Sequence, residues 1–171
     1  MKALIDADTI VYKAGFSGQK TVYEAIGFKD GTPINMGEHQ FDTMGSYKYW
    51  VENLADKDLE WEMAKTINPE PLSHVLHRVK LQMQVILGLK DVTSNSVFLS
   101  PPGKIFRHDI YPEYKANRKD ADKPIYYQEI RDYLRKQWKA SVVEGYEADD
   151  MLGIEQCTSA EETIICSTDK N

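Results

Sequence analysis

The stretch Ala3-Leu4-Ile5-Asp6-Ala7-Asp8 joins a short apolar run to two carboxylates, and it sets the pattern for the whole chain. Three further runs are equally short and rich in β-branched residues, namely Val97–Leu99, Ser141–Val143 and Thr163–Cys166. Runs of this kind are typical of parallel strands that are buried on both faces. The sequence therefore predicts four buried strands, the first of which ends at Asp6.

Helical patterns lie between these runs. Apolar residues fall on one helical face between residues 72 and 87, and Gly88 is a suitable helix end. Pro124 can open a second helix, whose apolar residues recur at near four-residue spacing: Tyr127, Ile130, Leu134 and Trp138. Strands that alternate with helices predict an α/β fold with a mostly parallel central sheet flanked by helices.

Two stretches fit this scheme less well. Thr21–Phe28 and Pro33–Met36 flank the turn signal Asp30-Gly31, which predicts a peripheral hairpin. Residues 47–67 are amphipathic and rich in acids, which predicts a further peripheral helix. With 171 residues, 42% of them hydrophobic, the chain is expected to bury one core and form a single domain over residues 1–171.

The composition indicates a cytoplasmic protein. Asp6 and Asp8 interrupt the first apolar run, so no export signal is expected, and no apolar stretch is long enough for a membrane span. Cys157 and Cys166 lack the spacing of a metal site and are expected to be reduced thiols.

The net charge of −6 is unevenly distributed. Residues 104–139 contain ten Lys and Arg against six Asp and Glu, a local charge of +4, so the remainder carries −10. A basic stretch beside an acidic body suits an enzyme that grips phosphate in one place and gathers carboxylates around a metal in another. A solvated charged helix is the simpler alternative.

Carboxylates follow several of the predicted strands. Asp6 and Asp8 come after the first strand, Asp169 comes after the last, and the third precedes Glu147, Asp149 and Asp150. Because the carboxyl ends of parallel strands meet at one sheet edge, these acids are expected to converge. Hard oxygen donors favour Mg²⁺ or Mn²⁺ over zinc. Acids in the first turn of a helix are also favoured by its dipole, which is the structural alternative for residues 147–150.

A basic run, Tyr114-Lys115-Ala116-Asn117-Arg118-Lys119, follows Phe106-Arg107. If the run is helical, Lys115, Arg118 and Lys119 lie on overlapping faces and offer cations to successive phosphates. Tyr114 is suited to stack on an exposed base. A solvated polar loop is the alternative.

In this order, Phe-Arg, Tyr-Lys-x-Asn-Arg, Glu-Ala-Asp-Asp and Ser-x-Asp-Lys form a pattern that resembles the N-terminal nuclease domain of the 5′–3′ exonuclease and flap endonuclease family, in particular its bacteriophage and bacterial polymerase-associated members. If the protein is phage-encoded, its expected compartment is the host cytoplasm. The resemblance implies a PIN-like α/β sheet with a helical arch over the active site. It also implies a C-terminal helix–three-turn–helix region that binds duplex DNA, which is expected to be absent from this chain.

The resemblance assigns roles by position. It implies metal ligands at Asp6, Glu147, Asp149, Asp150 and Asp169, for two Mg²⁺ or Mn²⁺ ions. It implies catalytic cations at Lys115 and Arg118, and DNA contacts at these two and at Arg107, Tyr114 and Lys119. Asp8 has no firm counterpart in the family, so as a candidate metal ligand it ranks below Asp6. Ser100 and Asn171 stand where the family has acids.

The chain is therefore expected to be a metal-dependent 5′–3′ exonuclease or flap endonuclease of DNA replication, forming the N-terminal portion of a longer enzyme. Its expected partners are DNA with a 5′ end or flap, a C-terminal DNA-binding fragment or a replication protein, and no membrane. One alternative is a catalytically impaired remnant that binds DNA or protein, because Ser100 and Asn171 replace acids. A lesser one is a phosphatase of the haloacid dehalogenase type with Asp6 as nucleophile. A PIN-type ribonuclease differs only in its substrate.

Overall fold

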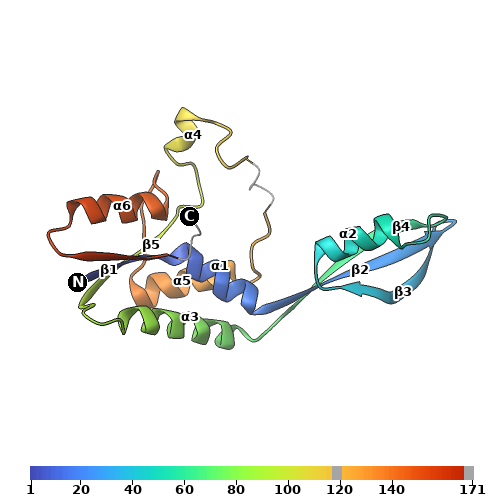
Figure 1. Ribbon diagram of the computed structural model, residues 1–171, viewed down its shortest axis with the longest axis horizontal. Helices are drawn as coiled ribbons and strands as arrows, with labels where there is room; N and C mark the ends of the chain where they lie inside the picture. Colours follow the sequence, from blue (N-terminus) through green and yellow to red (C-terminus); the bar gives the residue numbers. More distant parts are fainter. Residues whose placement is uncertain (117–120, 168–171) are drawn as a thin grey trace. The chain divides into compact units, whose positions relative to one another are not determined.

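Four parallel strands form the central sheet of the protein, whose structure is a computed structural model that describes residues 1–116 and 121–167 (Figure 1). β1 pairs in register with β5, from Lys2 opposite Ser94 to Asp6 opposite Phe98, and β7 pairs with β1 on its other side. In spatial order the strands are β6 (Ser141–Val142), β5 (Ser94–Leu99), β1 (Lys2–Asp6) and β7 (Thr163–Cys166). The predicted α/β fold with a mostly parallel sheet is confirmed.

Helices cover both faces of this sheet (Figure 1). Because side chains alternate along a strand, Ala3 and Ile5 pack on one side and Leu4 on the other. The first side carries α1 (Ala7–Ser17), α3 (Leu72–Leu87) and α5 (Tyr127–Trp138), and the second carries α6 (Ala148–Thr158). The two helices predicted over 72–87 and after Pro124 are confirmed.

A glycine sets how closely α1 approaches the start of α5. A Cβ atom at Gly15 would lie 2.5 Å from the Cγ atom of Pro124, closer than any real contact. Pro124, which precedes α5, therefore packs closely against the C-terminal half of α1. Among the described residues no helix has the length and apolar character needed to span a bilayer.

The chain divides into two units, Met1–Gly18 with Pro71–Asn171, and Gln19–Glu70. The second unit is an antiparallel sheet in the order β3 (Thr32–Phe41), β2 (Gln19–Lys29) and β4 (Glu60–Pro69). α2 (Met44–Asn53) packs on it through Trp50, Trp61 and His39. The predicted hairpin is confirmed as β2 (Gln19–Lys29) and β3 (Thr32–Phe41). The prediction of a single nuclease domain over residues 1–171 stays a prediction.

The helix predicted over residues 47–67 is wrong beyond its first turns. α2 ends at Asn53, and β4 (Glu60–Pro69) pairs with β2 over its whole length. The half-buried residues of β4 are Trp61, Ala64 and Ile67, whose spacing of three imitates a helix. Pairing along β2 overrides that local pattern.

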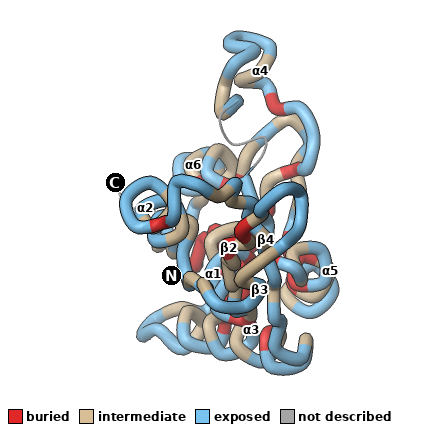
Figure 2. The backbone as a smooth tube through the Cα atoms, turned by 90° about the vertical axis from the view of Figure 1, so that its right-hand side faces the viewer, coloured by how far each residue is buried: buried red, intermediate tan, exposed pale blue. Residues whose placement is uncertain are grey.

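The predicted helical arch is only partly helical where the structure describes it. Between β5 and α5 the one described helix is α4 (Arg107–Ile110), which has no buried residue (Figure 2). Lys115 has φ = +54°, in the left-handed region, so no α-helix runs through it. The condition that residues 114–119 form one helix is therefore not met at Lys115, and residues 117–120 lie outside the described part.

Candidate active site

Asp6 ends β1 and at the same time caps α1. Its carboxylate accepts the backbone N–H of Asp8 at 3.0 Å and the hydroxyl of Ser167 at 3.1 Å. Only 5% of the residue is exposed. Burial, followed by the nearby charge of Asp8, raises the pKa of Asp6 to about 6, although the Ser167 hydrogen bond opposes the shift. The charge of Asp149 adds to the rise.

Replacing Asp6 with asparagine is expected to stabilise the metal-free protein in a pH-dependent way. The folded pKa of about 6 lies above the ordinary value of 3.8, so ionisation costs stability as the pH rises through the window from about 4 to about 6. Asp6→Asn keeps an N-cap acceptor and removes this cost, which is on the order of 2–3 kcal/mol. Urea unfolding at pH 4 and pH 7 should show the gain only at the higher pH. An equal gain at both would contradict the assigned pKa.

A buried arginine holds Asp8. Arg131 of α5 is 5% exposed, and its Nη1 donates to Asp8 Oδ1 at 3.1 Å while its Nη2 donates to the Ser100 carbonyl at 2.7 Å. The N–H of Ser100 donates to Asp8 Oδ2 at 3.0 Å. The hydroxyl of Ser100 accepts the N–H of Ala148, the first residue of α6, at 3.0 Å. Ser100 and Arg131 thus link the start of α1, the end of β5, α5 and the start of α6.

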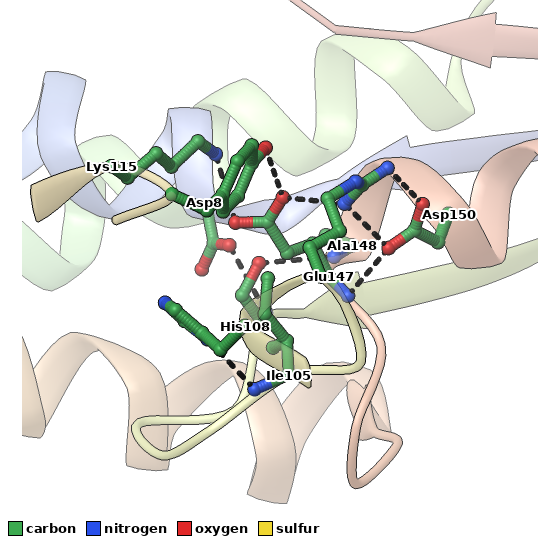
Figure 3. A network of polar contacts seen from close by, with 10 residues as sticks. Asp8, Ile105, His108, Lys115, Glu147, Ala148 and Asp150 are labelled. Carbon is green, nitrogen blue, oxygen red and sulfur yellow. Dashed lines mark hydrogen bonds and ion pairs between the residues drawn. The ribbon is translucent and has the colours of Figure 1, made fainter. Parts of the chain in front are cut away.

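Glu147 gathers three donors at the start of α6 (Figure 3). Lys115 Nζ lies 2.8 Å from Oε1, while Arg107 Nη1 and the Tyr114 hydroxyl lie 2.8 Å and 3.1 Å from Oε2. Burial opposes ionisation of Glu147, but the contacts with Lys115, Tyr114 and Arg107 outweigh it and hold its pKa below the usual range. Burial would likewise lower the pKa of Lys115, yet Glu147 raises it. The ion pair stays fully charged at neutral pH.

Asp150 faces Arg107 and the helix start. Both of its oxygens pair with the Arg107 guanidinium, and Oδ2 also accepts the N–H of Glu147 at 3.0 Å (Figure 3). Its neighbour Asp149 is exposed and lines a cavity that Asp150 does not line. The two adjacent acids therefore have different surroundings, which the sequence pattern does not distinguish.

Asparagine substitutions should separate these two acids by stability. Asp150→Asn removes the carboxylate charge that pairs with the Arg107 guanidinium, and it weakens the N-cap of α6. The free energy of unfolding is therefore expected to fall by about 1–2 kcal/mol. Asp149→Asn should change it by less than about 0.5 kcal/mol, as is usual for an exposed side chain. Thermal unfolding of both variants checks this, and a larger loss in Asp149→Asn would contradict the assignment.

Carboxylates and three lysines, Lys13, Lys115 and Lys123, line a cavity of about 740 Å³ in the first unit. Of the residues expected in the site, four line this cavity: Asp6, Lys115, Glu147 and Asp149. Asp8, which ranked below Asp6, lines it as well. Arg107, Tyr114 and Asp150 do not line it and join the site through Glu147. Arg118, Lys119, Asp169 and Asn171 lie outside the described residues.

The donors on this cavity fit a divalent cation in kind. They are carboxylates, which suit Mg²⁺ or Mn²⁺, and the raised pKa of Asp6 marks a place where a cation would relieve repulsion between them. Within residues 1–116 and 121–167, no three acid, histidine or cysteine side chains already converge as a ready metal site. Glu147 is instead paired with Lys115 at 2.8 Å.

Sequence reasoning missed Arg131. A signal was available, because Tyr127, Ile130, Arg131 and Leu134 have the i, i+3, i+4, i+7 spacing of one helical face. A charge at such a position indicates a buried partner. Ser100 was noted only as a replaced acid, whereas its hydroxyl accepts from Ala148 and its N–H donates to Asp8. These two hydrogen bonds of Ser100 depend on backbone geometry, which the spacing of residues in the sequence does not reveal.

Comparison with known proteins gives one family. Residues 62–171 match the family model described as "5′-3′ exonuclease, N-terminal resolvase-like domain". No solved structure matches the chain. The matched residues cover more than half of the sequence and include Lys115, Glu147 and Asp149 of the cavity together with Arg107 and Asp150 behind it. The chain belongs to the 5′–3′ exonuclease N-terminal, resolvase-like domain family.

Proposed function

We propose that this chain is the nuclease portion of a divalent-metal-dependent 5′–3′ exonuclease or flap endonuclease that hydrolyses phosphodiester bonds in DNA. Family membership indicates a nuclease function, and the family is generally dependent on divalent metal ions. The observation that carries the proposal is one cavity lined by Asp6, Glu147, Asp149 and the cation of Lys115. Acid clusters with a nearby cation suit metal-assisted attack on a phosphate.

Asp6, Glu147, Asp149 and Asp169 would hold the metal. Two ions of Mg²⁺ or Mn²⁺ are expected at the site. Bound metal supplies an activated water as nucleophile and stabilises the departing 3′ oxygen. We assign Asp150 a different role from the one its position in the motif implies. Its contacts support a positioning role, since it holds Arg107 against Glu147.

Lys115 and Arg118 would neutralise the charge that builds on the phosphate during cleavage. Lys115 is suited to this because it comes from the loop and lines the cavity, 2.8 Å from Glu147. To contact a phosphate, the Lys115 ammonium group would leave the Glu147 carboxylate and pair with a phosphate oxygen. Arg107, Tyr114 and Lys119 would contact the DNA beside the cleaved bond.

Cleavage of a 5′-labelled flap duplex tests the proposal. We expect products that depend on Mg²⁺, disappear with EDTA, and have lengths that report cleavage at or near the 5′ end. The same assay with an RNA strand separates a DNA enzyme from a ribonuclease. A folded chain that cleaves neither substrate would favour the impaired remnant. Family membership does not favour the phosphatase, and hydrolysis of a small phosphomonoester would be its signature.

In the cell, the expected partners are a replication protein or a C-terminal fragment that grips duplex DNA, and a bacteriophage origin remains part of this proposal. Adding a duplex-binding fragment of the family should then lower the KM for flap DNA with little change in kcat. A rise in kcat alone would instead indicate that the fragment completes the catalytic site.

A further inference from the structure

Among the described residues, Asp8 is the one carboxylate on the cavity that the proposed metal site does not use. It comes from the first turn of α1, directly after Asp6 ends β1. Its charge contributes to the raised pKa of Asp6, after burial and ahead of the charge of Asp149. Asp8 therefore acts on the buried carboxylate more strongly than Asp149, which is an expected metal ligand.

Asp8 and Ser100 follow two neighbouring strands by the same number of residues. β1 and β5 are parallel with Asp6 opposite Phe98, and each of the two residues comes two positions later in the chain. The backbone N–H of Ser100 donates to Asp8 Oδ2 at 3.0 Å, within the polar network of Figure 3. The resemblance places an acid at position 100, where this chain has a serine. The Asp8 carboxylate thus lies within hydrogen-bond distance of the backbone from which that acid would extend.

A buried cation orients the Asp8 carboxylate and leaves it open to the cavity. Arg131 Nη1 donates to Asp8 Oδ1 at 3.1 Å, and the two side chains are 6% and 22% exposed. A carboxylate offers about four lone-pair positions, so the hydrogen bonds from Arg131 and Ser100 leave a position on each oxygen. Because Asp8 lines the cavity, these positions are available to a cation there. Hydrogen bonds from residues behind the site are usual for carboxylates that bind metal.

We propose that Asp8 binds the divalent metal ion in this chain and stands in for the acid that is absent at position 100, with Arg131 as the positioning residue that fixes its carboxylate. This inference rests on the proposed function, since it concerns the same site. The Ser100 hydroxyl is a neutral donor set and already accepts the N–H of Ala148 at 3.0 Å. A carboxylate from the start of α1 restores the negative charge that a serine at the end of β5 lacks. Ser100 is then no sign of a lost metal site, which removes one of the two reasons for the impaired remnant.

Calorimetric titration of Mg²⁺ without DNA tests the proposal, because it measures the metal affinity and needs no activity. The first variant is Asp8→Asn. The second combines Asp8→Asn with Ser100→Asp, which returns a carboxylate to the position where the resemblance expects it. The control is Glu144→Gln, at an exposed acid that does not line the cavity.

Asp8→Asn should raise the Kd for Mg²⁺ by at least about tenfold, and the combination with Ser100→Asp should return it to within about threefold of the wild-type value. The control should bind as the wild type does. An Asp8→Asn variant with the wild-type Kd overturns the proposal. A folded combined variant that regains no affinity also overturns it, since the two positions would then not serve the same ion.

A third variant separates a metal ligand from a mere counter-ion of Arg131. In Asp8→Asn the Arg131 guanidinium loses its carboxylate, and its charge alone can repel a metal ion. Asp8→Asn with Arg131→Met removes both charges together. We expect its Kd to stay at least about tenfold above the wild-type value. Wild-type affinity in this variant would overturn the proposal, because Asp8 would then only neutralise Arg131. Thermal unfolding without metal checks that each variant is folded.

This proposal and the proposed function fail in different ways. If the wild type binds Mg²⁺ and cleaves flap DNA while Asp8→Asn keeps the wild-type Kd, the assignment of Asp8 alone is wrong. If the wild type binds Mg²⁺ and loses affinity in Asp8→Asn, but cleaves neither DNA nor RNA, the nuclease proposal is wrong and Asp8 remains a metal ligand.

Discussion

Asp149→Asn is expected to reduce the rate of flap cleavage by about 10³-fold or more while leaving the unfolding temperature unchanged. The Asp149 carboxylate is exposed on the cavity, and its charge acts on the buried Asp6. An amide in its place has no charge to bind a metal that must activate water, so the loss falls on the chemical step. Single-turnover rates with saturating chain and Mg²⁺ measure it.

Glu144→Gln is the matched control for this result. Glu144 is also an exposed acid, precedes α6 by only a few residues, and does not line the cavity. Its loss should change the rate by less than about twofold. If Asp149→Asn keeps a rate within tenfold of the wild type, or if both variants lose activity alike, the metal site lies elsewhere.

Arg131→Met is expected to lower the free energy of unfolding by about 2–4 kcal/mol. The guanidinium side chain is 6% exposed and donates to Asp8 and to the Ser100 carbonyl. Its removal leaves the Ser100 carbonyl without this donor and Asp8 Oδ1 without its charged partner, while Asp8 Oδ2 keeps the N–H of Ser100. Urea unfolding measures the effect, and Arg135→Met, at an exposed arginine one turn further along α5, should show little change.

A double-mutant cycle identifies the partner of Arg131. In an Asp8→Asn background the cost of Arg131→Met should shrink, since the uncompensated carboxylate is gone. Additive losses would mean that Arg131 stabilises the fold through packing alone, without holding Asp8.

The sheet and its helices were predictable because their periodicity is strong. The runs at 3–5 and 97–99 are buried on both faces, and α3 and α5 carry clear apolar stripes. β4 was not predictable, because Trp61, Ala64 and Ile67 repeat at a helical spacing and only pairing with β2 makes the segment a strand. Local patterns fail where a long-range partner decides the structure.

The site was predictable in its residue types and only partly in its geometry. Strand order brings Asp6 and Asp149 near each other, since acids at the carboxyl ends of parallel strands converge. The sequence motif does not distinguish Asp149 from Asp150, whereas in the structure the first turn of α6 places Asp150 against Arg107. Which acid faces the cavity depends on a helix start that the motif does not encode. Arg118 and Asp169 stay predictions.

Calorimetric titration of Mg²⁺ into the chain, without DNA, tests the central claim that the cavity carboxylates hold the metal. The account predicts saturable binding by the wild type, weakened by at least about a hundredfold in Asp6→Asn with Asp149→Asn, and retained in Glu144→Gln. Equal binding by the wild type and the double variant would contradict it, as would a folded wild type that binds no metal at all.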